Sequence, residues 1–112
     1  MTATDSLDCL FQVMADPYRR SFVERLCKGP ASVKELAGTA DVQLPAVLKH
    51  LNILETGGIV VSQKVGRVRT YRMRQDAFTI LSDWIDIRQQ DMNAAFDRLA
   101  ELMAEVPEEK DH

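Results

Sequence analysis

The basic residues of this chain are concentrated in one stretch, where their chemistry would be anion binding. Between Gln43 and Arg74 there are six lysines and arginines and a single acid, Glu55, so the stretch has a formal charge of +5. The remaining residues hold eight bases and sixteen acids, a charge of −8. Carboxylates weaken nearby phosphate contacts, so bases almost without acids indicate a surface for nucleic acid. A solvated hairpin edge would also carry bases, but it would not exclude acids.

Two predicted elements carry these bases, a helix from about Leu44 to Thr56 and a hairpin over residues 59–74. At about 100° per residue, the helix places Leu44, Val47, Leu51 and Leu54 on one face. The opposite face includes Lys49, a residue type that binds guanine edges or phosphate, and the other residues on it are Pro45, Ala46, His50, Asn52 and Ile53. For His50, a packing role and a phosphate contact both remain open. The residues expected to contact DNA are Gln43, Leu44, Pro45, Ala46, Lys49, His50, Asn52, Lys64, Arg67 and Arg69.

Other chemistry has few candidates. The sequence has no Ser-His-Asp or Cys-His arrangement and no glycine-rich phosphate loop, so we expect no catalytic residue and no enzyme. We also expect no cofactor. The two cysteines, Cys9 and Cys27, are not spaced as a CxxC pair. They are interpreted either as small packed hydrophobes or as the site of a redox input through thiol oxidation or persulfide formation.

Capping residues and periodicity predict the elements that position the basic stretch. A first helix over 5–15 carries Leu7, Leu10, Phe11 and Met14 at helical spacing. Asp16-Pro17 opens a second helix that stops at Gly29-Pro30. Ser32 and Glu35 form a capping box that opens a short third helix. Residues 32–56 are therefore expected to form a helix-turn-helix, and residues 59–74 a wing.

A long helix is predicted over residues 76–106. Apolar residues recur every seven positions in one series, and an interleaved second series is broken only by Arg88. Such a stripe is buried against another long helix. The first series is Phe78, Ile85, Met92, Leu99 and Val106, and the second is Leu81, Arg88, Ala95 and Leu102. The predicted fold class is mainly α with a small β-hairpin, a winged helix-turn-helix with a long C-terminal dimerisation helix.

Five segments of the chain resemble ArsR-type transcriptional repressors in order and spacing. They are FQVMADPYRR at 11–20, GPASVKELA at 29–37, LPAVLKHL at 44–51, LETGGIV at 54–60 and GRVRTYR at 66–72. The resemblance covers roughly residues 7 to 75. It implies a homodimeric repressor that binds a partly palindromic operator of double-stranded DNA and releases it on an input signal.

The resemblance also implies that the first and last helices form the dimer interface. The residues expected there are Leu7, Leu10, Phe11, Met14, Phe78, Leu81, Trp84, Ile85, Met92, Phe96 and Leu99. Two departures stand out at the recognition helix, where Gln43 and Leu48 replace the serines usual in the family. The segment Glu35-Leu36-Ala37 lacks the cysteines of the family's metal sensors, and the last helix has no histidine before His112. The chain therefore resembles the branch without metal ligands.

Length and composition agree with a single domain over 1–112. The chain has 112 residues, of which 46% are hydrophobic and 28% charged. We expect no membrane span and no secretion signal, and a cytoplasmic protein. An alternative function is a winged-helix module that binds a protein partner through the same basic face. The operator, the regulated genes and the inducer do not follow from the sequence.

Overall fold

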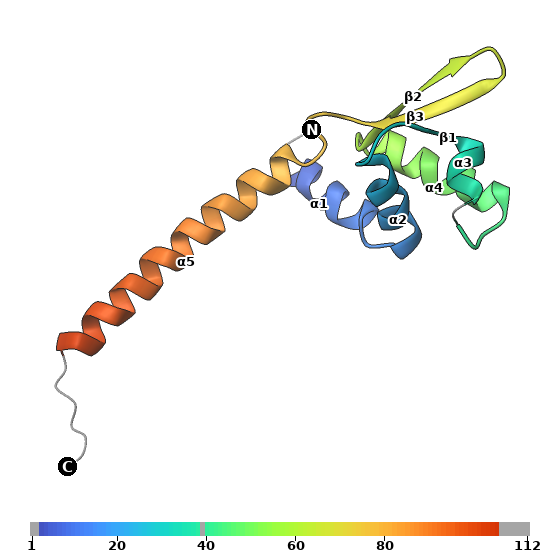
Figure 1. Cartoon of the computed structure of the whole chain (residues 1–112). Coiled ribbons are helices and arrows are strands. Elements are labelled where there is room, and N and C mark those ends of the chain that lie inside the picture. Colours follow the sequence, from blue (N-terminus) through green and yellow to red (C-terminus); the bar gives the residue numbers. More distant parts are fainter. Residues whose placement is uncertain (1–2, 39, 106–112) are drawn as a thin grey trace. The chain divides into compact units, whose positions relative to one another are not determined.

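The computed structural model describes residues 3–38 and 40–105. In chain order the elements are α1 (Ala3–Val13), α2 (Pro17–Leu26), β1 (Ala31–Ser32), α3 (Val33–Gly38), α4 (Leu44–Thr56), β2 (Val60–Val65), β3 (Val68–Met73) and α5 (Thr79–Glu105) (Figure 1). The contacts divide the chain into two compact units, Met1–Ile80 and Leu81–His112. The expectation of one domain over 1–112 stays a prediction.

Two predicted helix starts of the first unit, at Asp16 and Ser32, are confirmed by their capping bonds, whereas the first helix runs over Ala3–Val13 and not over the predicted residues 5–15. The carboxylate of Asp16 accepts from the backbone N–H groups of Tyr18 (2.8 Å) and Arg19 (3.1 Å). In the capping box, the N–H of Ser32 donates to Glu35 Oε1 at 2.8 Å, and the N–H of Glu35 donates to Ser32 Oγ at 3.1 Å. Each cap satisfies backbone donors that the helix itself leaves without partners. The starts of α2 and α3 are therefore fixed by local sequence.

Three antiparallel strands form the sheet, in the order β1-β3-β2. The hairpin of β2 and β3 is confirmed, with Val65 opposite Val68 at its tip. Gly66 between them has a φ of +65°, a left-handed conformation that favours glycine. Figure 1 shows this hairpin extending beyond the helices as a wing. The sequence did not predict β1, because two residues show no alternation and Ala31–Ser32 becomes a strand only by pairing with β3.

The core of the first unit lies between α2, α3, α4 and the base of the wing. Its largest fully buried side chains are Phe22, Leu36, Leu51, Leu54, Ile59, Val47 and Val60. The expected apolar face of α4 is confirmed at Val47, Leu51 and Leu54 but is wrong at Leu44, which is 51% exposed. Leu44 is the first residue of α4 and extends past the packed core. On α1, Leu10 is only 3% exposed. Leu10 therefore packs inside this chain, and its place in the expected dimer interface is corrected here.

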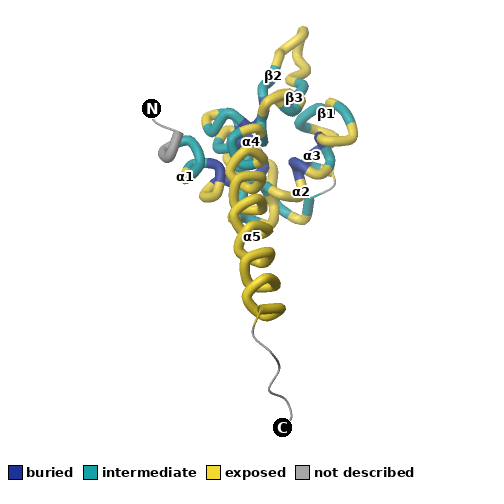
Figure 2. The backbone as a smooth tube through the Cα atoms, turned by 90° about the vertical axis from the view of Figure 1, so that its left-hand side faces the viewer, coloured by how far each residue is buried: buried dark blue, intermediate teal, exposed yellow. Residues whose placement is uncertain are grey.

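The second unit consists of α5 from Leu81 onward. The helix begins at Thr79, three residues later than predicted, because the N–H groups of Ala77 and Thr79 close turns on Arg74 and Asp76. Phe78 therefore precedes the helix, and Val106 lies outside the described residues. No residue of α5 is buried, and its colour in Figure 2 is almost entirely that of exposed residues. None of the described helices is apolar enough over a sufficient length to cross a membrane.

Candidate DNA-binding surface

The outward face of α4 carries most of the residues predicted to contact DNA. Gln43, Leu44, Pro45, Lys49 and Asn52 are exposed, and Ala46 is half-buried. Gln43 occupies the N-cap without a side-chain hydrogen bond, and Pro45 lies in the first turn, where a missing N–H costs nothing. The start of α4 is thus left open, with backbone donors that no side chain covers. Such a helix end can approach a phosphate or a base edge.

His50 lies on α4 but not on this face. Its side chain is only 17% exposed, and its ring stacks on Tyr18 with centroids 5.8 Å apart. Nη1 of Arg19 lies 3.3 Å from Nδ1 of His50, and the Asp16 carboxylate is 4.0 Å from the same nitrogen. These contacts come from α2, which packs against the inner side of α4. His50 is therefore a packing residue, and its expected DNA contact is corrected here.

Arg19 connects three helices around His50. Its Nε donates to the carbonyl of Val13 (2.6 Å) and its Nη2 to that of Gln12 (3.3 Å), so it caps the end of α1. Burial raises the pKa of Asp16, but the N–H groups of Arg19 and Tyr18, with the charges of His50 and Arg19, outweigh burial and lower that pKa below 3.8. Arg19 therefore stabilises the place where α1, α2 and α4 meet.

The wing carries the other predicted bases, in two different environments. Lys64 and Arg67 are exposed, and within the described residues no side-chain hydrogen bond or ion pair holds either of them. Arg69 lies opposite Lys64 in the hairpin register, but its Nη1 donates to Ser62 Oγ at 2.8 Å. Ser62 Oγ in turn donates to Glu55 Oε2 of α4 at 2.8 Å. This Arg69–Ser62–Glu55 relay ties the wing to α4.

The side of the wing that faces α4 is fixed by the alternation of its strands. Tyr71 is buried against the core, so its strand neighbours two positions away, Arg69 and Met73, lie on the same side. Burial raises the pKa of Tyr71, and the nearby Glu55 carboxylate raises it further, although Arg69 acts in the opposite direction. Lys64 and Arg69 therefore share the side of the sheet that α4 covers, which places wing bases and α4 in one surface.

Comparisons with known proteins agree with this arrangement. A family model described as a helix-turn-helix domain matches residues 14–63. The HTH-type transcriptional regulator Rv2034 of Mycobacterium tuberculosis is 37% identical over 86 residues, which are 77% of this chain and 80% of that protein. The crystal structure of the ArsR family transcriptional regulator RHA00566 is 39% identical, with a TM-score of 0.75, over 80% of this chain and 93% of that one.

The chain belongs to the ArsR family of helix-turn-helix transcriptional regulators. A homodimeric winged helix-turn-helix DNA-binding domain from Mycobacterium bovis, Mb0332, shares the fold, with a TM-score of 0.64 at 18% identity, over 81% of this chain and 85% of that one. The predicted family and fold class are thereby confirmed. Both the family and the fold are those of regulators of transcription.

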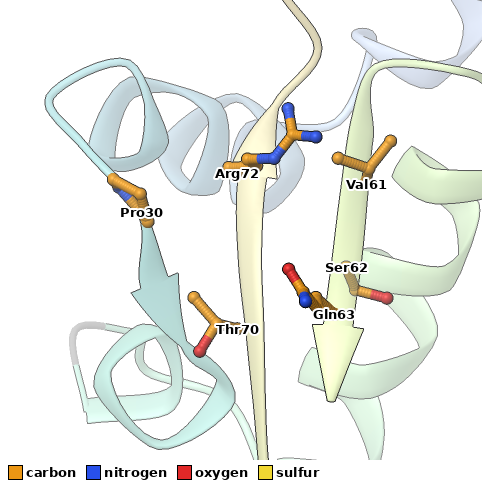
Figure 3. A pocket seen from close by; sticks show the side chains of 6 residues that line it. All are labelled: Pro30, Val61, Ser62, Gln63, Thr70 and Arg72. Carbon is orange, nitrogen blue, oxygen red and sulfur yellow. The ribbon is translucent and has the colours of Figure 1, made fainter. Parts of the chain in front are cut away.

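The opposite side of the wing of this ArsR-family regulator has a different character. A shallow hollow of about 350 Å³ lies there, lined by Pro30, Val61, Ser62, Gln63, Thr70 and Arg72 (Figure 3). Arg72 is exposed on this side, away from Tyr71 and α4. Its charge belongs to the basic stretch of the sequence but not to the surface that α4 and the wing share.

The two cysteines are free thiols in separate places. Cys9 of α1 is half-buried and lines a hollow of about 290 Å³ together with Asn52 and Gly57. Cys27 is exposed at the C-cap of α2. Among the described residues no group of three or more His, Cys, Asp or Glu side chains is placed to hold a metal ion. A redox role for either thiol stays a prediction.

The sequence alone does not predict the relay that orients Arg69. In the sequence, Glu55 is notable only as the single acid of the basic stretch, and Ser62 has no neighbour that marks it. A signal was available, because Ser62 is the strand neighbour directly opposite Tyr71. A polar residue opposite a core tyrosine needs a partner, and Glu55 on α4 supplies it.

Proposed function

We propose that this ArsR-family regulator is a homodimeric repressor that binds a partly palindromic operator in double-stranded DNA and leaves it on an input signal. The observation that carries the proposal is the shared surface of α4 and the wing. Exposed Lys49, Lys64 and Arg67 lie on it, whereas acids dominate the remainder of the sequence. The α4 helix would enter the major groove, and the wing would follow the phosphate backbone.

Individual residues of this surface have different proposed tasks. Lys49 and Asn52, together with the short side chains of Pro45 and Ala46, face the groove and would contact base edges. Lys64 and Arg67 would bind phosphates, which positions the protein without selecting sequence. Arg69 would contribute its charge from a fixed place, since Ser62 and Glu55 hold it. Gln43 and Leu44 would border the groove at the start of α4.

The dimer is proposed from the apolar side chains that α5 leaves exposed. Trp84, Ile85, Met92, Phe96 and Leu99 are each 40–61% exposed on a helix without a single buried residue. An exposed apolar stripe of this length is buried by a second helix in stable proteins. The proposed interface also includes five further residues, none of which is buried: Phe78 and Leu81, Leu7 and Phe11 of α1, and Met14 just after α1. The fold relative Mb0332 is itself homodimeric.

A two-fold dimer explains why the operator would be partly palindromic. Two copies of α4 related by symmetry would meet successive major grooves about 34 Å apart. A repressor acting on DNA works where the DNA is, so we place this protein in the cytoplasm. The alternative of a protein-binding module receives no support from the family, whose members compared above are regulators of transcription.

Footprinting on the DNA upstream of its own gene tests the proposal. The purified protein should protect two half-sites about one helical turn apart, and Lys49→Ala and Asn52→Ala should alter the preference among altered half-sites. Glu101→Gln, on α5 and far in sequence from the basic stretch, is a control that should leave the footprint unchanged. Protection without half-sites, or equal loss on all sequences, would refute the proposed base contacts.

A further inference from the structure

A hollow beneath the tip of the wing lies next to the proposed DNA surface. Its walls come from the start of α3, the first residue of α4 and the beginning of β3, all within the first unit. Its volume is about 480 Å³, within the range of small-molecule sites. The lining residues are Ser32, Val33, Lys34, Ala37, Leu44, Arg67, Val68 and Arg69.

The chemistry of the hollow is an apolar floor with a basic rim. Leu44 and Val68 are 51% and 53% exposed although both are large and apolar, and Val33 and Ala37 continue the same wall. Three bases, Lys34, Arg67 and Arg69, stand around it, and no described residue that lines it is acidic. The carboxylate of neighbouring Glu35 is already bonded to the backbone N–H of Ser32.

We infer that this hollow binds an amphipathic anion, a small molecule with an apolar chain or ring and one carboxylate. The apolar body would cover Leu44 and Val68, removing their surface from water. The carboxylate would stay at the rim and accept charge-assisted hydrogen bonds from Lys34 and Arg67. A neutral molecule would lose those bonds, and a short anion such as acetate would lose the apolar contact.

Binding there would release DNA, an inference that rests on the proposed function. Leu44, Arg67 and Arg69 belong both to the hollow and to the proposed DNA surface. An anion at the rim neutralises positive charge that the phosphates need, and its body blocks the approach to the start of α4. The ligand and the operator would therefore compete directly, without a change of fold. This assigns a chemical class to the input signal.

The site is tested first without DNA. Sodium octanoate, well below its micelle-forming concentration, is titrated into the ¹⁵N-labelled full-length protein, and backbone amide shifts are followed by NMR. We expect saturable shifts confined to residues 32–37, 44 and 67–69. Octanamide and acetate should each bind about tenfold more weakly, because each lacks one half of the recognition. Shifts spread along α5, or equal binding of octanamide, would overturn the inference.

Matched variants separate the site from general effects of charge and apolarity. Lys34→Glu should weaken octanoate binding about tenfold, and Lys28→Glu, at another exposed lysine outside the hollow, should not. Val68→Thr should weaken binding, whereas Val65→Thr should not, although these two exposed valines face each other across the hairpin. Equal behaviour within either pair would overturn the site.

The competition is then measured with fluorescent upstream DNA. Octanoate should raise the apparent Kd for DNA by a factor of one plus the ratio of its concentration to its own Kd for the hollow, and Lys34→Glu should shift this response to about tenfold higher octanoate. Octanoate bound at the hollow with no effect on DNA affinity would overturn the regulatory role. Failure to bind DNA in the absence of octanoate would instead refute the proposed function and with it the competition, while the NMR titration decides the site by itself.

Discussion

Replacing Leu99 with glutamate should separate the two chains of the proposed dimer. Leu99 is 50% exposed on α5. Burying a whole leucine side chain is worth about 1.5–3 kcal/mol, so covering the exposed half contributes about 1 kcal/mol. A two-fold interface contains the residue twice, which makes about 2 kcal/mol, or about thirtyfold in the dissociation constant. Each buried carboxylate adds a further desolvation cost, so thirtyfold is the smallest effect expected.

Sedimentation equilibrium over a range of protein concentrations measures this dissociation constant. The fluorescence of Trp84, the only tryptophan of the chain, reports independently on the environment of α5. Gln90→Glu is the matched control, because it adds the same charge on the same helix. Gln90 is nine residues before Leu99, two and a half turns away, and lies on the opposite side of α5.

The comparison of the two variants decides the placement of the interface. Leu99→Glu should be monomeric at concentrations where Gln90→Glu and the unmodified protein are dimers, and circular dichroism should show the same helix content in all three. If Leu99→Glu dimerises as tightly as Gln90→Glu, the exposed stripe of α5 is not the dimer interface.

Three further predictions concern the first unit. Arg67→Ala should reduce the slope of log K, the association constant for DNA, against log salt by about 0.9 for each bound copy. Arg72→Ala, on the far side of the wing, should leave the slope unchanged. Anisotropy titrations at several salt concentrations measure both slopes. The lowered pKa of Asp16 means that its carboxylate stabilises the fold above its ordinary pKa of 3.8 and that this contribution is lost as the pH falls through the folded value. Asp16→Asn keeps an N-cap, so urea unfolding of this variant should depend less on pH below about 4, and an unchanged pH dependence would contradict the cap. Gly57→Ala should destabilise the fold by about 1–3 kcal/mol, because its new Cβ would lie 3.0 Å from Val13 Cγ2. An unchanged urea midpoint would show that the Val13 side chain moves aside without cost.

Features set by neighbouring residues were predictable from the sequence. The Asp16 cap, the Ser32–Glu35 box and the bounds of α4 depend on contacts within a few positions, and the structure confirms all of them. The hairpin followed from the β-branched residues around Gly66. The exposed apolar residues of α5 also followed from periodicity, although its first turn was placed too early.

Features set by contacts between distant segments were not predictable. The strand Ala31–Ser32 exists only because β3 lies beside it, about forty residues later. His50 lies at the edge of the buried face of α4, where Arg19 and Tyr18 of α2 contact it. Its position along the α4 helix does not by itself reveal that another helix packs there. The relay from Arg69 through Ser62 to Glu55 likewise joins three elements. In each case the residues could have adopted another conformation or contact, and a distant segment of the chain determines the one observed.

The central claim is that α4 and the wing form a surface for DNA phosphates and base edges. Fluorescence anisotropy of labelled upstream DNA, titrated with the unmodified protein across a range of salt concentrations, tests it most directly. If Lys64, Arg67 and Arg69 each bind one phosphate in both copies, the slope of log K against log salt should be about −5. Tight binding at low salt that falls with this slope would agree with the account. No binding at low salt, or binding that salt does not weaken, would contradict it.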